Sequence, residues 1–174
     1  MQKFFQLSVH PRDEHGKFSE KGIMELTEEE RLELLDFLEK EEYEDFKGFH
    51  ISARKIDAVK AGLYREEVYA CDVLTRQGFD VFLLDEKYVA GKKADTFFKK
   101  DGLRDFLELK HTSDKKITRQ YNSSIEQAPS CFIVVDGYMS RLQKENLEAA
   151  IKSNANAKTV YLYVRSSDTF LKIK

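Results

Sequence analysis

An Asp-Gly pair between two runs of aromatic and apolar residues constrains this chain more than any other feature. Asp101 and Gly102 separate residues 93–100 from residues 103–110. Such a pair favours a two-residue type I′ turn, because both central positions of that turn need a positive φ angle. The sequence therefore predicts an antiparallel β-hairpin with Asp101 and Gly102 as its loop.

The register of this hairpin brings charged side chains to one face of a sheet. Counting outward from the turn, Phe97 lies opposite Phe106, and Asp95 lies opposite Glu108. Lys110 follows Glu108 by two residues, so it shares that face. Two adjacent carboxylates repel each other unless a cation neutralises them, and an oxygen-binding ion such as Mg²⁺ is suited to that role. We therefore expect a divalent-metal site at the open end of the hairpin.

Apolar periodicity and turn residues predict the remaining elements. A capping box at Thr27 and Glu30 opens a helix that we expect to reach about Phe46. Further helices are expected over about 52–77, with Gly62 as a point of interruption, and over about 114–127 and 140–152. Strands are expected over 79–84, 131–136, 159–165 and 169–173. This order predicts an α/β fold, a mixed β-sheet flanked by helices.

The distribution of charge divides the chain. Residues 1–50 carry 7 lysine and arginine residues against 14 aspartate and glutamate residues, whereas the remainder is mildly basic. We expect an acidic leader with an accessory helix over residues 1–50, and the main α/β domain over residues 51–174. A basic body is compatible with a polyanionic partner such as nucleic acid.

The sequence carries no feature of a membrane protein. Its longest apolar runs are far too short to span a bilayer, and the first ten residues lack the apolar stretch of a signal peptide. Cys71 and Cys131 lack metal-site spacing, so we expect two buried, reduced thiols. These features together predict a cytoplasmic location and no membrane partner.

The acidic pair with its lysine resembles a known family. Asp95, followed by Glu108-Leu109-Lys110 on the next strand, resembles the D…(D/E)xK motif of PD-(D/E)xK nucleases. The similarity extends from about residue 62 to residue 136, although Ala94 stands where the family's name-giving proline would be. It most resembles the C-terminal nuclease domains of contact-dependent growth inhibition and related polymorphic toxins.

The resemblance implies further site residues. Family members place an acidic residue on a preceding helix, and Glu66 or Glu67 occupies that position here. Glu66 is favoured because it stands four residues before Ala70, as in the family's E-x(3)-A pattern. Several subgroups carry a glutamine on the helix after the lysine, and Gln127 is similar.

The resemblance also implies a fold and an activity. It implies a restriction-endonuclease-like αβββαβ core with an N-terminal helical extension. The implied activity is a metal-dependent endonuclease that hydrolyses DNA or RNA, including tRNA, with Mg²⁺ or Mn²⁺ held by Asp95, Glu108 and the helix glutamate. A toxin-type effector would also have an inhibitor or immunity protein as a partner.

Basic residues near the motif are candidates for contacts with nucleic-acid phosphates. They are Lys93, Lys115, Lys116 and Arg119. Two other interpretations remain open on the sequence alone. The charged residues could be a solvated strand face, which would make this a catalytically inert binding module of a phage or mobile element. The third interpretation is a DNA-processing, resolvase-like nuclease.

Overall fold

The computed structural model describes residues 22–85, 94–154 and 156–174. Its α-helices are α2 (Glu28–Leu38), α3 (Ile56–Lys60), α4 (Arg65–Arg76), α5 (Ile117–Ser124) and α6 (Arg141–Ser153). Short 3₁₀ helices are η1 (Ile23–Glu25), η3 (Asp114–Lys116) and η4 (Arg165–Ser167). The strands are β1 (Tyr43–Phe46), β2 (Phe49–Ser52), β3 (Asp80–Leu83), β4 (Thr96–Lys100), β5 (Leu103–Thr112), β6 (Ser130–Val135), β7 (Thr159–Val164) and β8 (Thr169–Lys172). The predicted α/β class is confirmed.

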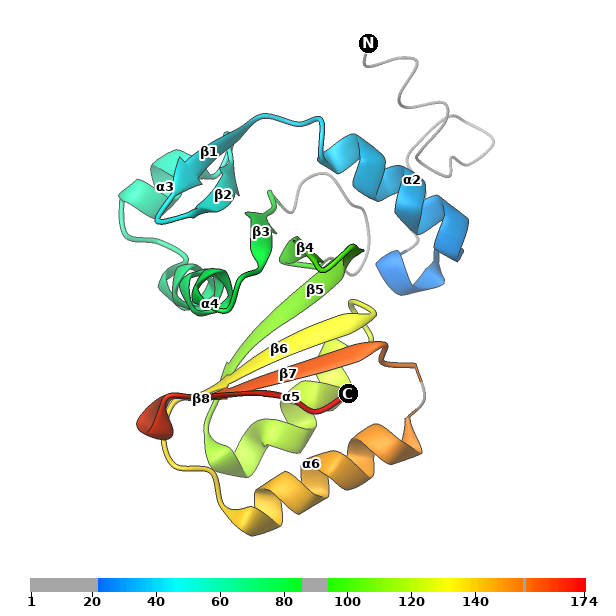
Figure 1. Cartoon of the computed structure of the whole chain (residues 1–174), viewed down its shortest axis with the longest axis vertical. Coiled ribbons are helices and arrows are strands. Elements are labelled where there is room, and N and C mark those ends of the chain that lie inside the picture. Colours follow the sequence, from blue (N-terminus) through cyan, green and yellow to red (C-terminus); the bar gives the residue numbers. More distant parts are fainter. Residues whose placement is uncertain (1–21, 86–93, 155) are drawn as a thin grey trace.

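The described strands form an eight-stranded mixed sheet whose spatial order follows the order along the chain. The pairs β2–β3, β5–β6 and β6–β7 are parallel, and the other neighbours are antiparallel. The long strand β5 pairs with β4 through residues 103–107 and with β6 through residues 107–112. In Figure 1 it joins an upper part, made of β1–β4, to a lower part, made of β6–β8. The first half of β5 therefore pairs with β4, and its second half pairs with β6.

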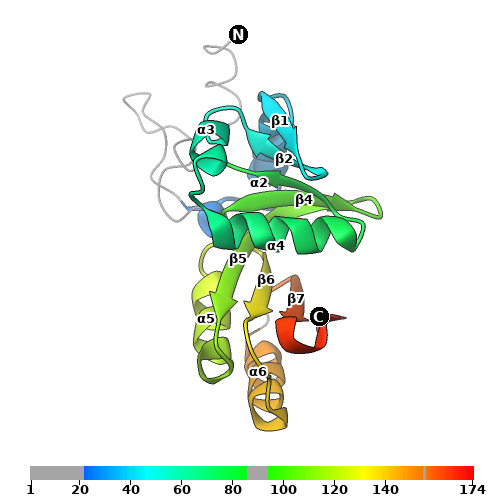
Figure 2. The same cartoon turned by 90° about the vertical axis from the view of Figure 1, so that its left-hand side faces the viewer.

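Helices cover both faces of the sheet. The helices α3 and α4 pack on one face, and Figure 2 shows α4 lying across the strands there. The helices α5 and α6 pack on the other face of β6 and β7, and α2 packs on that face at β3–β5. Residues alternate between the two faces along β5, so Leu107 and Leu109 contact the α4 side whereas Phe106 contacts the α2 side. The even-numbered residues Glu108 and Lys110 accordingly belong to the face of α2 and α5.

The predicted hairpin register is confirmed. Lys100 lies opposite Leu103, and Phe97 lies opposite Phe106. Asp101 and Gly102 have φ angles of 50° and 78°, as a type I′ turn requires. Both predicted thiols, Cys71 and Cys131, are buried and free.

We expect Gly102→Ala to destabilise the protein by about 1 kcal/mol, because an L side chain is strained at positive φ. A Cβ atom at Gly102 would meet nothing within 4 Å, so the conformational strain is the whole effect. Gly137→Ala is the matched control, since its added Cβ also meets nothing within 4 Å and its φ is not positive. Urea unfolding of both variants measures the difference, and equal effects would contradict the turn assignment.

The N-terminal helix is shorter than predicted. Its capping box is present, since Thr27 N–H donates to Glu30 Oε2 over 2.7 Å and Glu30 N–H donates to Thr27 Oγ1 over 3.1 Å. The expectation that it reaches Phe46 was wrong: α2 ends at Leu38, and residues 43–52 form the β1–β2 hairpin. Parallel pairing of β2 with β3 stabilises this hairpin, and such long-range pairing overrides local helix propensity.

The N-terminal part is joined to the rest of the described structure. The expected boundary after residue 50 falls within β2. The helix α2 buries Leu34, Leu35 and Leu38 against the sheet. Its carboxylates also pair with the β4–β5 hairpin, since Arg104 Nη1 lies 2.7 Å from Asp36 Oδ1.

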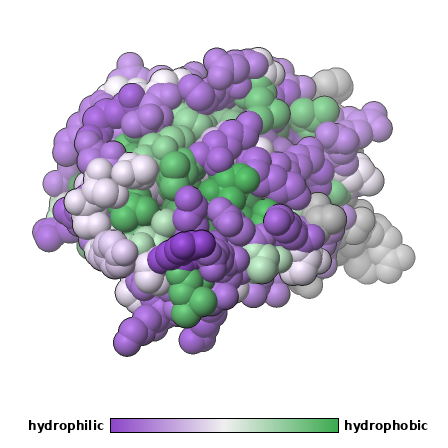
Figure 3. Space-filling view, turned by 60° about the horizontal axis from the view of Figure 1, so that its bottom comes forward, coloured by the Kyte–Doolittle hydropathy of each residue, from purple (hydrophilic) through white to green (hydrophobic). Residues whose placement is uncertain are grey.

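Within the described residues, no helix combines the length and apolar character needed to cross a membrane. The described side chains with large apolar surfaces in solvent include Leu63, Tyr138 and Leu142. Figure 3 shows that, on the face it displays, hydrophobic residues gather in several groups broken by hydrophilic ones.

Candidate metal centre

The candidate site lies where β4 stops pairing with β5. The last pair of this ladder joins Thr96 to Leu107, so Asp95 stands just outside the strand. Its side chain nonetheless stays at the edge of β5, because Leu109 N–H donates to Asp95 Oδ2 over 3.1 Å. The carboxylate therefore takes the place that a backbone carbonyl would have in a continuing ladder.

Glu108 is a buried carboxylate with one free oxygen. The residue is 2% exposed, and its Oε1 accepts a hydrogen bond from Lys110 Nζ over 2.7 Å. Its Oε2 is buried and has no hydrogen-bond partner within the described residues. Burial and, after it, the nearby Asp95 carboxylate raise the pKa of Glu108 to about 8, although Lys110 and the backbone N–H of Asp95 oppose the rise. A buried oxygen without a partner is costly, so this atom is a candidate ligand position.

Asp95 is held in a similar environment. Burial raises its pKa, while the Leu109 N–H and the charge of Lys110 lower it. The carboxylate of Glu67 acts in the raising direction, which places that helix residue near Asp95. Asp95, Glu108 and Lys110 thus come together as the hairpin register predicted.

The helix contributes Glu67 rather than Glu66. Glu67 is half-buried and acts on Asp95, whereas Glu66 is exposed to solvent. The chain turns at Gly62, with a φ of 87°, and α4 begins at Arg65. This start sets the phase of the helix and brings Glu67 toward the sheet. The sequence favoured Glu66 and kept Glu67 as the alternative, and that preference is corrected here, because Glu66 points to solvent and Glu67 is the glutamate that acts on Asp95.

The other predicted residues make no recorded contact with this cluster or lie outside the described structure. Gln127 lies beyond the end of α5, and its side-chain amide donates to Ser123 O over 3.4 Å. None of the hydrogen bonds found among the described residues joins Gln127 to Glu108 or Asp95. The three basic residues Lys115, Lys116 and Arg119 are exposed on η3 and α5. Lys93 lies outside the described residues.

Sequence analysis missed a second lysine at this site. Lys55 is 6% exposed, and its Nζ donates to Leu84 O over 3.2 Å. Leu84 N–H in turn donates to Asp95 O over 2.9 Å, so Lys55 is one residue removed from Asp95. Lys55 stands in the turn after β2, in a stretch that was expected to be helical. Its burial depends on long-range packing, so no local pattern marks it.

These residues fit a hard divalent cation in chemistry, although they are not a preformed cage. Within the described residues, no three His, Cys, Asp or Glu side chains are grouped closely enough to hold a metal ion. A bound cation would supply a partner to Glu108 Oε2 and would favour the ionised form of both carboxylates, whose pKa values are raised. Binding would require Glu67, Asp95 and Glu108 to approach one another.

No family model, curated protein or solved structure was found to match this chain. The chemistry of the site therefore has to be argued from its own residues.

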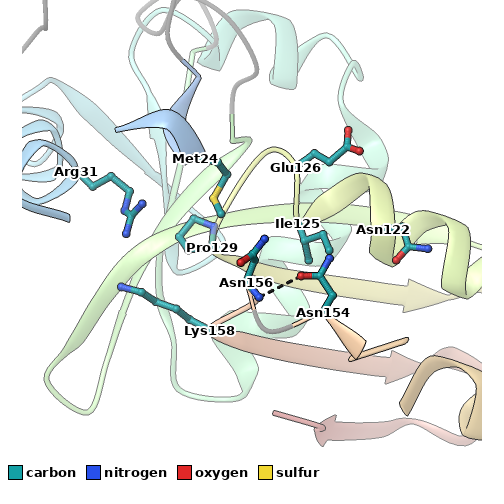
Figure 4. A pocket seen from close by; sticks show the side chains of 9 residues that line it. All are labelled: Met24, Arg31, Asn122, Ile125, Glu126, Pro129, Asn154, Asn156 and Lys158. Atoms are coloured by element: carbon teal, nitrogen blue, oxygen red, sulfur yellow. Dashed lines mark hydrogen bonds between the residues drawn. The ribbon is translucent and has the colours of Figure 1, made fainter. Parts of the chain in front are cut away.

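A cavity on the face of α2 and α5 is a separate feature. It has a volume of about 620 Å³ and is lined by Met24, Arg31, Asn122, Ile125, Glu126, Pro129, Asn154, Asn156 and Lys158 (Figure 4). Of its two cations, Arg31 and Lys158, the lysine pairs with Glu28 Oε1 over 3.1 Å and with Asp105 Oδ2 over 3.5 Å. None of the residues of the metal centre lines this cavity, so we do not assign the cavity to the metal centre.

Proposed function

We propose that this protein is a metal-dependent nuclease that hydrolyses phosphodiester bonds in DNA or RNA. One observation carries the proposal: the half-buried carboxylate of Asp95 and the buried carboxylate of Glu108 adjoin Lys110, and Glu108 Oε2 has no hydrogen-bond partner among the described residues. Burying charge is expensive, so such a group at the junction of two parts of a sheet indicates function more than stability.

Each residue has a distinct role in this proposal. Asp95, Glu108 and Glu67 would hold Mg²⁺ or Mn²⁺, which when bound would supply an activated water and stabilise charge on the phosphate. Lys110, now paired with Glu108, would turn its ammonium group toward a substrate phosphate and balance the charge that develops there. The ion pair with Glu108 therefore holds the Lys110 ammonium group next to the proposed metal ligands.

The proposed substrate is a nucleic acid whose backbone contacts the exposed cations Lys115, Lys116 and Arg119. Phosphate contacts of this kind position a substrate without reading its sequence. The resemblance to toxin nuclease domains favours a toxin-type effector, with an inhibitor or immunity protein as its partner.

The test is to incubate the purified protein with plasmid DNA and with total tRNA in Mg²⁺, Mn²⁺ or EDTA. We expect cleavage of one substrate class that requires the metal, and a loss of about 10²-fold or more in Lys110→Met. No cleavage by folded protein under any of these conditions, together with no Mn²⁺ binding, would support the inert binding module instead.

The two adjacent helix glutamates provide an internal comparison. We expect Glu67→Gln to weaken Mn²⁺ binding about tenfold, because it removes a negative charge that acts on Asp95. Glu66→Gln removes the same charge from an exposed position one residue away and should leave the affinity within about twofold. Calorimetry of both variants at one pH measures this, and a larger effect of Glu66→Gln would reverse the assignment.

A further inference from the structure

Lys55 is an unusual residue in this fold because its charge is buried. Lysine is almost never fully buried unless it is paired, and Lys55 is 6% exposed. Its Nζ lies 4.0 Å from the centre of the Tyr64 ring and donates to the backbone oxygen of Leu84. Neither a ring nor a carbonyl carries a formal negative charge, so neither of these two contacts supplies the ammonium group with a counter-ion.

The topology places Lys55 at the same edge of the sheet as Asp95. β2 and β3 are parallel and β4 is antiparallel to β3, so the end of β3 and the start of β4 meet at one edge of the sheet. Lys55 follows β2, Leu84 follows β3 and Asp95 precedes β4 at this edge. The Lys55 ammonium opposes the rise in the pKa of Asp95, which is further evidence that the two charges interact.

The charges of the cluster can then be balanced. Glu67, Asp95 and Glu108 contribute three carboxylates, and Lys55 and Lys110 contribute two ammonium groups. Lys110 donates a hydrogen bond to Glu108. Lys55 donates to the backbone oxygen of Leu84, which in turn is hydrogen-bonded to the backbone of Asp95. When a bound cation displaces the proton of Glu108, three carboxylates face two ammonium groups, and the excess charge of these five groups is negative. One divalent cation changes that excess to positive, and a second would add repulsion without a further carboxylate to offset it.

We infer that Lys55 is a positioning residue of the metal centre, whose buried ammonium takes the electrostatic place of a second cation and limits the site to one divalent metal ion. This inference rests on the proposed metal-binding function. Removing the Lys55 ammonium group should strengthen metal binding, because it takes a positive charge away from the neighbourhood of the metal ion. Damage to the fold should instead weaken metal binding.

The experiment titrates Mn²⁺ into the metal-free full chain by calorimetry at one pH and ionic strength. We expect the wild type to bind one ion and Lys55→Met to bind Mn²⁺ on the order of tenfold more tightly. Methionine keeps the stem that packs on Tyr64, and circular dichroism checks that the variant is folded. Lys55→Arg retains the charge and should bind Mn²⁺ with wild-type affinity.

The matched control is Lys60→Met, which removes an exposed lysine of α3 that pairs with Glu44 at the surface. It should leave the affinity unchanged, because solvent screens that charge. Two ions bound to the wild type, or an unchanged or weaker affinity in folded Lys55→Met, would overturn the inference. A wild type that binds no Mn²⁺ overturns this inference and the proposed metal site together. Tighter binding in Lys55→Met without any cleavage would support the inference and reject only the nuclease activity.

Discussion

Glu108→Gln is expected to abolish cleavage and at the same time to stabilise the metal-free protein at pH 8. Glutamine preserves the shape of the side chain but cannot act as an anionic metal ligand, so activity should fall by about 10³-fold or more. The stabilisation follows from burial, which raises the pKa of Glu108 from 4.5 in the unfolded chain to about 8 in the folded protein. The native state without metal therefore contains a carboxylate that folding disfavours.

The direction of the pH dependence follows from that raised pKa. The folded protein binds the Glu108 proton more tightly than the unfolded chain, so the associated stability is fully present below about pH 4.5. It is lost progressively as the pH rises and is gone above about pH 8. Each pKa unit corresponds to about 1.4 kcal/mol, so we expect Glu108→Gln to be more stable than wild type by about 2 kcal/mol at pH 8, after the lost Lys110 contact is discounted.

Thermal unfolding in EDTA at pH 5 and at pH 8 measures this effect. The advantage of Glu108→Gln should appear at pH 8 and shrink at pH 5, where Glu108 is protonated in the folded wild type. Saturating Mn²⁺ should reverse the order at pH 8, because a ligand stabilises the state that binds it. Glu66→Gln, an exposed carboxylate, is the control and should show no such pH dependence. A destabilised Glu108→Gln at pH 8 would falsify the view that this carboxylate is held at a cost in stability.

Phe97→Ala is expected to destabilise the protein by about 4 kcal/mol, the largest effect that we predict for a substitution outside the site. Phe97 is fully buried and stacks on Phe82, with ring centroids 4.3 Å apart and planes at 6°. It also lies opposite Phe106 in the ladder, under the helix α2. Truncation would leave a cavity between α2 and β4, the strand that directly follows Asp95.

Guanidinium unfolding monitored by circular dichroism measures this loss. Leu103→Ala, in the same hairpin but 43% exposed, is the comparison and should cost less than about 1 kcal/mol. Because Phe97 is two residues from Asp95, we also expect weaker Mn²⁺ binding in Phe97→Ala under conditions where it remains folded. Similar losses in both variants would show that the aromatic contacts are not a main part of this core.

Local sequence patterns determined the elements on which the site is built. The Asp101-Gly102 turn fixed the register of β4 and β5, since a two-residue loop allows one pairing and a strand alternates its faces. This was enough to bring Asp95 and Glu108 together and to place Lys110 beside them. The capping box likewise marked the start of α2 at Thr27.

Tertiary structure decided the features that depend on contacts distant in sequence. Residues 43–52 became a hairpin because β3 offers a strand to pair with, and that partner is not visible in their own pattern. Glu67 rather than Glu66 acts on Asp95 because α4, which begins at Arg65, packs on the sheet with Glu67 half-buried and Glu66 in solvent. Lys55 contacts Leu84, whose N–H donates to Asp95 O, because the parallel pairing of β2 with β3 brings the ends of these two strands together. A turn acts over a few residues and can be read directly, whereas burial and charge pairing depend on the whole fold.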